Sequence, residues 1–196
     1  MRAAVISVQG AAPEHVRALE RAMANLGLAG EAVAVRRPEQ LAGASCVVIP
    51  GGESTTISKL LRRFGLHEPL VRMGREGVPI MGTCAGCVLL ASEGDEEVRK
   101  TETRLLGLMD MAVDRNAFGR QRESFEASLH IDGLNSPFPG VFIRGPVITR
   151  TGPGCRTLCT YDGKVVMARQ DNLLALSFHP ELSGDTRIHE LLLGML

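Results

Sequence analysis

The segment 79–86 constrains the fold of this chain more than any other part of its sequence. Two apolar residues run into a Gly-x-Cys-x-Gly motif centred on Cys84, and a helix-forming run follows at once. This order predicts a tight strand–turn–helix junction that holds one side chain up out of the backbone. Gly82 and Gly86 suit the junction because a Cβ at either position would obstruct close approaches. The helix N-terminus would favour a thiolate, so the motif fits either a cysteine nucleophile or a purely structural turn.

A second motif, near the C-terminus, favours the nucleophile. An apolar strand expected over 173–178 ends in His179-Pro180-Glu181. A catalytic thiol needs a base that exchanges a proton near neutral pH, and a carboxylate that fixes the tautomer of that base. Pro180 favours an extended or turn conformation, in which residues two apart point in similar directions. We therefore expect Cys84, His179 and Glu181 to form a catalytic triad.

The other histidines give weaker signals. The chain has five, at His15, His67, His130, His179 and His189. Only His179 follows a strongly apolar strand. His67 and His189 each precede a glutamate in a helical or loop segment, and we interpret both as lying on solvated faces.

The cysteines leave two alternatives open. The chain has five, an odd number without a signal sequence, which indicates a reducing compartment rather than a disulfide framework. Cys84 and Cys87 have the spacing of a redox pair, and together with Cys155 and Cys159 they could bind zinc, although the spacing is loose. The glycines around Cys84 fit a nucleophile better, so we expect no metal and no cofactor.

A third strand-to-helix junction, over 46–56, contains consecutive glycines. Ser54 or Thr55 is expected to cap the helix that follows. Acyl transfer needs two N–H donors directed at the developing negative oxygen. The amides of Gly52 and Ala85 could form this oxyanion hole, and an ordinary turn is the alternative.

Composition excludes several classes of function. With 196 residues, of which 44% are hydrophobic, the chain can bury a full core, and we expect one domain over 1–196. Its 22 basic and 22 acidic residues balance, which favours neither nucleic acid nor an anionic membrane as a partner. No apolar run approaches the ~20 residues that span a bilayer, so a soluble cytoplasmic protein is expected.

Strand and helix patterns alternate through the first half of the chain, which predicts a mainly parallel sheet with helices on both faces. Segment 93–104 is interpreted as an exposed loop. Short strands dominate after residue 108, and an amphipathic helix closes the chain. The expected strands are 3–8, 31–35, 46–49, 78–81, 108–113, 128–131, 141–143, 155–161, 165–169 and 173–178, with a helical stretch over 55–76.

Gly82-Thr83-Cys84-Ala85-Gly86 together with His179-Pro180-Glu181 resembles the class I glutamine amidotransferases, which share a Cys-His-Glu triad. Further stretches resemble one branch of them, the glutaminase subunits of pyridoxal 5′-phosphate synthase, from the first strand to the last helix. These are Val8-Gln9-Gly10-Ala11, Pro50-Gly51-Gly52-Glu53-Ser54-Thr55-Thr56, Arg115-Asn116-x-Phe118-Gly119-Arg120-Gln121, Ser124-Phe125-Glu126-Ala127, Phe142-Ile143-Arg144-x-Pro146 and Ser177-Phe178-His179-Pro180-Glu181-Leu182.

This resemblance implies a three-layer, flavodoxin-like α/β fold and hydrolysis of L-glutamine to glutamate and ammonia. It also implies a (β/α)8-barrel synthase subunit as partner, which combines the ammonia with two sugar phosphates to make the cofactor form of vitamin B6. Cys84 would be the nucleophile, His179 the acid–base and Glu181 its orienting partner. Glutamine would be held by Gly52, Glu53, Ser54, Arg115, Ile143 and Arg144. Two residues depart from the pattern: Gly145 replaces an expected alanine, and Cys87 an expected aliphatic residue.

Overall fold

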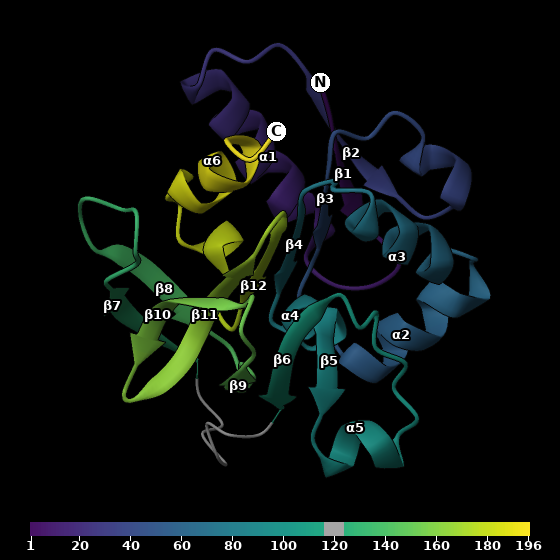
Figure 1. The fold of residues 1–196 in the computed structure, drawn as a ribbon. Coiled ribbons are helices and arrows are strands. Elements are labelled where there is room, and N and C mark those ends of the chain that lie inside the picture. Colours follow the sequence, from purple (N-terminus) through teal and green to yellow (C-terminus); the bar gives the residue numbers. More distant parts are fainter. Residues whose placement is uncertain (116–123) are drawn as a thin grey trace.

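The computed structural model describes residues 1–115 and 124–196, and a large sheet runs through its centre (Figure 1). Its strands are β1 (Arg2–Ile6), β2 (Glu31–Val35), β3 (Cys46–Ile49), β4 (Ile80–Thr83), β5 (Ala91–Gly94), β6 (Met109–Asp114), β9 (Val147–Thr151), β10 (Arg156–Tyr161), β11 (Lys164–Gln170) and β12 (Leu173–Leu176). Their order is β2-β1-β3-β4-β12-β11-β9-β6-β5, and β10 pairs with β11.

The parallel half of this sheet comprises β2, β1, β3, β4 and β12, as the alternating pattern predicts. Strand β12 is the last strand along the chain, and it pairs with β4, so that Leu176 lies opposite Thr83. Ligand and catalytic groups of such sheets gather beyond the carboxyl ends of the strands. Cys84 and the segment after Leu176 therefore emerge at the same edge.

Alternate residues of the central strands supply two separate cores. In β1, Ala4 and Ile6 pack on one face while Ala3 and Val5 pack on the other, because successive side chains of a strand point to opposite faces. Helices α2, α3 and α4 lie on the first face, and α1 and α6 on the second (Figure 1). The helices are α1 (Ala12–Asn25), α2 (Ser54–Arg63), α3 (His67–Arg75), α4 (Ala85–Leu90), α5 (Glu96–Lys100) and α6 (Arg187–Leu193).

The three-layer α/β prediction is thus confirmed. Short 3-10 turns occur at η1 (Pro38–Leu41) and η2 (Pro180–Leu182). None of the helices in 1–115 and 124–196 is long and apolar enough to cross a membrane.

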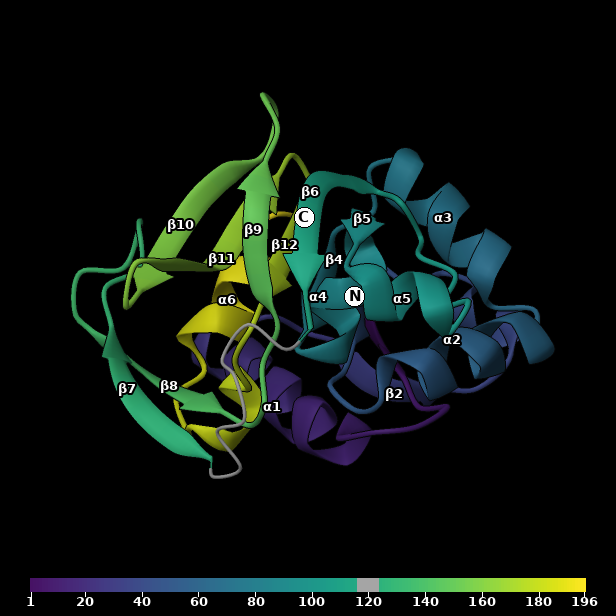
Figure 2. The ribbon, with the colours of Figure 1, turned by 90° about the horizontal axis from the view of Figure 1, so that it is seen from below.

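A small antiparallel pair, β7 (Phe125–Leu129) and β8 (Phe138–Phe142), lies at the end of the molecule away from α2 and α3 (Figure 2). The rings of Phe125 and Phe142 stack with centroids 4.7 Å apart, and Phe142 also contacts Phe178. The amide of His179 donates to the carbonyl of Val141 at 2.8 Å. These contacts therefore attach the segment around His179 to β8.

Several boundaries differ from the sequence-based expectation. The helical stretch 55–76 is two helices, α2 and α3, because the chain turns at Gly65 with a φ of +70°. Segment 93–104 is not a simple loop but contains α5, whose Val98 is buried. Strand β9 had no clear signal, since Val147 and Ile148 are its only strongly apolar residues.

Gly86→Ala is expected to destabilise the fold. A Cβ at this position would lie 2.1 Å from the carbonyl oxygen of Ile49, so α4 would have to move off β3. We expect the free energy of unfolding in urea to fall by about 1–3 kcal/mol. Gly154→Ala is the control, because its nearest neighbours are atoms of Gln170 at 4.0 Å. Equal stability of the two variants would contradict this close packing.

Candidate active site

Cys84 lies at the turn between β4 and α4 with a φ of 50° and a ψ of −104°. A positive φ is costly for a residue with a Cβ and persists only where neighbouring contacts enforce it. Here the amide of Cys84 donates to the carbonyl of Leu176 at 2.7 Å, and the amide of Val88 donates to the carbonyl of Cys84 at 3.2 Å. The predicted strand–turn–helix junction is therefore present, and Cys84 is 8% exposed.

Gly51 shows how close Cys84 and His179 are. A Cβ built on Gly51 would lie 2.4 Å from Cε1 of His179 and 3.2 Å from Cβ of Cys84. The thiol and the imidazole thus flank the same glycine. The structure thus brings together two residues that lie far apart in the sequence, as expected.

Glu181 completes the expected trio. Its Oε1 lies 2.8 Å from Nδ1 of His179, and the carboxylate side chain is 0% exposed. Burial opposes protonation of His179, but its interactions with Cys84 and Glu181 raise its pKa to about 10. At neutral pH the imidazolium form is favoured, so a positive charge lies beside the side chain of Cys84.

Nε2 of His179 is buried and makes no hydrogen bond with the described residues. The ring and the thiol therefore interact through charge and proximity rather than through a well-aligned hydrogen bond. Such contacts often tighten only when substrate is bound.

The remaining cysteines are not equivalent to Cys84. All five are unpaired, and burial raises the pKa of Cys87, that of Cys46 to about 12 and that of Cys159 to about 11. Because Cys87 is 0% exposed and points into the core, it is unsuited to act as the second thiol of a redox pair. Residues 1–115 and 124–196 contain no cluster of three or more side chains that could hold a metal ion.

The loop after β3 lies beside the thiol. The amide of Glu53 donates to Oε1 of Gln9 at 3.0 Å, which holds the loop against the segment after β1. Gly52 has no acceptor for its amide among the described residues. Ala85 is the first residue of α4, so its amide has no partner within the helix. Both amides of the expected oxyanion hole are available.

The expected cap of α2 was wrong. Neither Ser54 nor Thr55 caps the helix; the carboxylate of Glu53 accepts from the amides of Thr55 at 2.9 Å and Thr56 at 2.7 Å. Burial opposes ionisation of Glu53, but hydrogen bonds from the Thr56 hydroxyl and from these amides lower its pKa to about 2. Glu53 therefore carries a fixed negative charge next to Gly52.

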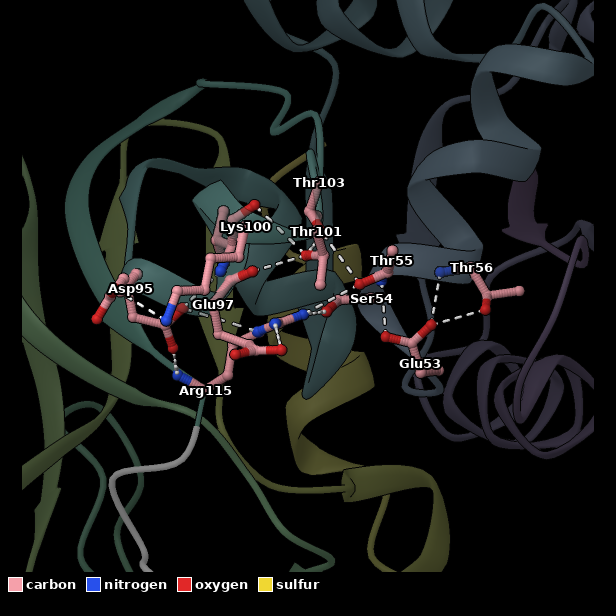
Figure 3. Close-up of polar contacts among 12 residues, drawn as sticks. Glu53, Ser54, Thr55, Thr56, Asp95, Glu97, Lys100, Thr101, Thr103 and Arg115 are labelled. Carbon is pink, nitrogen blue, oxygen red and sulfur yellow. Dashed lines mark hydrogen bonds and ion pairs between the residues drawn. The ribbon is translucent and has the colours of Figure 1, made fainter.

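Arg115 lies between α5 and the start of α2 (Figure 3). Its Nη1 donates to the hydroxyls of Ser54 at 3.0 Å and Thr55 at 3.2 Å. Its backbone amide donates to Oδ2 of Asp95 at 2.8 Å, and Nη2 lies 3.8 Å from Oε1 of Glu97. Ser54 and Arg115 are thus brought together as expected, whereas the other residues of the motif, 116–121, lie outside the described residues.

Sequence reasoning missed the two acidic residues, Asp95 and Glu97, because their segment is highly charged and was taken for a loop. One signal was present: Asp95 precedes two glutamates and then Val98, a pattern typical of a helix start. The structure shows Oδ1 of Asp95 accepting from the amide of Val98 at 2.7 Å. Its carboxylate therefore caps α5 and holds the backbone of Arg115.

Ile143, directly after β8, approaches the thiol, and Arg144 follows it in the chain. Sγ of Cys84 lies 4.0 Å from the carbonyl oxygen of Ile143. Arg144 has a φ of 48° and is exposed. A Cβ at Gly145 would lie 2.3 Å from the carbonyl oxygen of Ser177, so the alanine expected from the resemblance would require this loop to shift.

Two histidines lie close to the site without having been expected there. His15 and His189 are both 0% exposed, and Nε2 of His15 lies 3.3 Å from Oε2 of Glu181. The interpretation of His189 and His67 as solvated was wrong, since His67 is only 5% exposed. The sequence did contain a signal of their burial. His15 precedes Leu19 by four residues, and His189 precedes Leu193 by four, so each histidine shares the apolar face of its helix.

Comparison with known proteins gives a consistent result. The model of the SNO glutamine amidotransferase family matches residues 5–196. A protein of Methanosarcina barkeri named pyridoxal 5′-phosphate synthase subunit PdxT is 51% identical over 196 residues, covering 100% of this chain and 98% of the relative. The protein of the same name from Archaeoglobus fulgidus is 51% identical over 195 residues. The crystal structure of a glutamine amidotransferase has a TM-score of 0.89 at 43% identity, covering 98% of this chain and 97% of that one.

A mostly parallel sheet of this order, with a cysteine at the turn after β4 and a His-x-Glu after β12, is the arrangement of a glutamine amidotransferase. Within that class, the chain belongs to the SNO glutamine amidotransferase family. The resemblance seen in the sequence motifs is therefore confirmed.

Cys84 is expected to react with iodoacetamide ahead of the other four cysteines at pH 7. The positive charge of His179 lies beside Cys84, whereas burial raises the pKa of Cys46, Cys87, Cys155 and Cys159 and disfavours their reactive form. Peptide mass spectrometry after brief labelling measures the order in which the cysteines react. Cys84→Ser should abolish the fast reaction, and equally fast labelling of Cys155 would contradict the assignment.

Proposed function

We propose that this chain, acting as one domain over 1–196, is the glutaminase subunit of a pyridoxal 5′-phosphate synthase. The observation that carries the proposal is the buried Cys84, His179 and Glu181 arrangement, with His179 and Glu181 joined at 2.8 Å. Relatives about half identical over their full length bear the name of that subunit, which supports the same assignment. The activity is hydrolysis of L-glutamine to L-glutamate and ammonia.

The reaction begins with the Cys84 thiolate, which attacks the carbon of the glutamine side-chain amide. The negative charge that develops on the amide oxygen is stabilised by the amides of Gly52 and Ala85, and each such donor contributes on the order of 3 kcal/mol. The Nε2 proton of His179 then passes to the nitrogen, and the carbon–nitrogen bond breaks to release ammonia. A thioester to Cys84 remains.

In the second half of the reaction His179 takes a proton from water, and the hydroxide attacks the thioester carbon. The carbon–sulfur bond breaks, glutamate leaves and the thiolate–imidazolium pair is restored. Glu181 remains ionised throughout and stabilises the imidazolium. The raised pKa of His179 supports this role, since the residue enters the reaction protonated.

Glutamine binds across the loop after β3, the end of β6 and the loop after β8. Arg115 and Arg144 offer guanidinium groups to the substrate carboxylate, and Glu53 offers a negative charge to its ammonium. Ser54 and Ile143 complete the site. The proximity of Ser54 and Arg115 at 3.0 Å supports a common binding surface.

Ammonia loses its nucleophilicity when it is protonated in water, so it must reach its acceptor along a shielded route. We propose that a (β/α)8-barrel synthase subunit docks over the site, receives the ammonia directly and forms a cytoplasmic hetero-oligomer with this chain. The relatives are named as subunits, which supports such an assembly.

Cys84→Ala tests the assignment in the complex with the synthase. We expect glutamine-dependent formation of pyridoxal 5′-phosphate to fall by about 10³-fold or more, because the nucleophile is lost. Synthesis from added ammonium salt should remain, since the acceptor chemistry belongs to the partner. Glutamate release that survives the substitution would refute the proposed mechanism, and failure with every synthase subunit supplied would point to a different acceptor.

Arg115→Lys tests glutamine binding. The substitution keeps the charge but removes the planar fork, so KM for glutamine should rise about tenfold while kcat changes less. Arg150→Lys is the matched control, because Arg150 pairs only with Glu93 and Asp110 among the described residues, on the surface. If Arg115→Lys had the same KM for glutamine as the control, Arg115 would not be part of the glutamine-binding site.

A further inference from the structure

The triad carboxylate has a second buried partner. Oε1 of Glu181 binds His179, while Oε2 lies 3.3 Å from Nε2 of His15 and has no hydrogen bond within 1–115 and 124–196. Nε2 of His15 also lies 3.2 Å from Oγ1 of Thr83, the residue before the nucleophile. The contact with Oε2 is thus a charge–dipole contact, in which the carboxylate and the hydroxyl share one ring nitrogen.

A third histidine extends this chain of contacts. Nδ1 of His15 lies 3.0 Å from Nε2 of His189, and the other ring nitrogen of His189, Nδ1, is buried without a hydrogen bond among the described residues. Residues His179, Glu181, His15 and His189 therefore form a continuous buried row. It joins the turn after β12 to α1 and α6.

The contacts determine the tautomers. If Nδ1 of His15 carried the proton, the bare Nε2 would face the carboxylate, and His189 would hold a buried N–H without an acceptor. Both consequences of this tautomer are unfavourable. The buried N–H of His189 is the more costly one, because an unsatisfied buried donor costs more than an unsatisfied acceptor. With the opposite choice, His189 donates from Nε2 to His15, and the Nε2–H of His15 donates to Oγ1 of Thr83 while lying 3.3 Å from the charged Oε2 of Glu181.

We propose that His15 is a positioning residue of the glutaminase site: its Nε2–H, bound to Thr83, stabilises the free oxygen of Glu181 through the charge–dipole contact at 3.3 Å, and His189 fixes the tautomer that makes this possible. The inference rests on the proposed triad. His15 touches neither substrate nor the thiol, so it acts only through Glu181 and, beyond it, His179.

The charges around His15 support this role. Burial, then His189 and His179, lower the pKa of His15, and burial, then Arg21, lower that of His189 to about 4 despite the opposing effect of Glu190. Both rings are therefore neutral when the enzyme works. A neutral donor orients the carboxylate but leaves its negative charge available to the His179 imidazolium, whereas a second cation would compete for it.

His15→Gln and His15→Asn separate positioning from packing. The amide of glutamine reaches the place of Nε2 and can still donate to Glu181, while the shorter asparagine amide reaches only the place of Nδ1, next to His189. In the complex with the synthase, kcat for glutamine hydrolysis should stay within about threefold for His15→Gln and fall about tenfold or more for His15→Asn and His15→Leu. KM should change little in all three.

The pH profile gives a readout that packing alone would not move. Losing the contact to Oε2 weakens the hold of Glu181 on the imidazolium, so the pKa of His179 falls. The alkaline limb of kcat/KM should therefore move to lower pH in His15→Leu and His15→Asn, and stay in place in His15→Gln. His67→Gln is the matched control: His67 is buried, but it bonds to the carbonyl of Leu105, away from Glu181.

Thermal unfolding of every variant shows whether it is folded at the assay temperature. If His15→Leu is unfolded there, the comparison of His15→Gln with His15→Asn tests the proposal. Equal kcat and equal pH profiles for His15→Gln and His15→Asn would overturn the proposal. Cys84→Ala distinguishes this from failure of the proposed function: if it retains glutaminase activity, the triad itself is wrong, whereas its inactivity together with unaffected His15 variants removes only the role of His15.

Discussion

The site depends on the parallel pairing of β12 with β4. Residues from the middle of the chain and from near its C-terminus become neighbours because Leu176 pairs with Thr83 and its carbonyl accepts a hydrogen bond from the amide of Cys84 at 2.7 Å. A slip of one residue would turn the side chains of β12 to the other face of the sheet. The two cores prevent such a slip, since Leu174 and Leu176 fill one and Leu173 and Ala175 the other.

Burial then gives the site its electrostatic character. Cys84 is 8% and His179 7% exposed, so the interactions between thiol, imidazole and carboxylate are weakly screened by water. The same burial keeps His15 and His189 neutral, and it raises the pKa of the other thiols. One environment thus separates a charged histidine, His179, from its neutral neighbours His15 and His189.

The sequence predicted much of the fold and the central trio. Strands 31–35 and 46–49 were correct to the residue because short runs rich in valine between turn signals have few alternatives. It failed at α5, at β9 and at the cap of α2, where short, charged or mixed segments take their structure from contacts with distant residues. Glu53 caps α2, although Ser54 and Thr55 have suitable side chains, because the loop places its carboxylate over the free amides.

The sequence alone determined the chemistry: a cysteine between glycines before a helix, a histidine and a glutamate two residues apart after an apolar strand, and arginines at strand ends. Local geometry and residue type suffice for these, since each motif carries its own backbone constraint. Only the tertiary structure decided which groups meet, including the contact of Glu181 with His15 and that of Arg115 with Asp95. Strand order and helix packing fix such distances, and no local pattern encodes them.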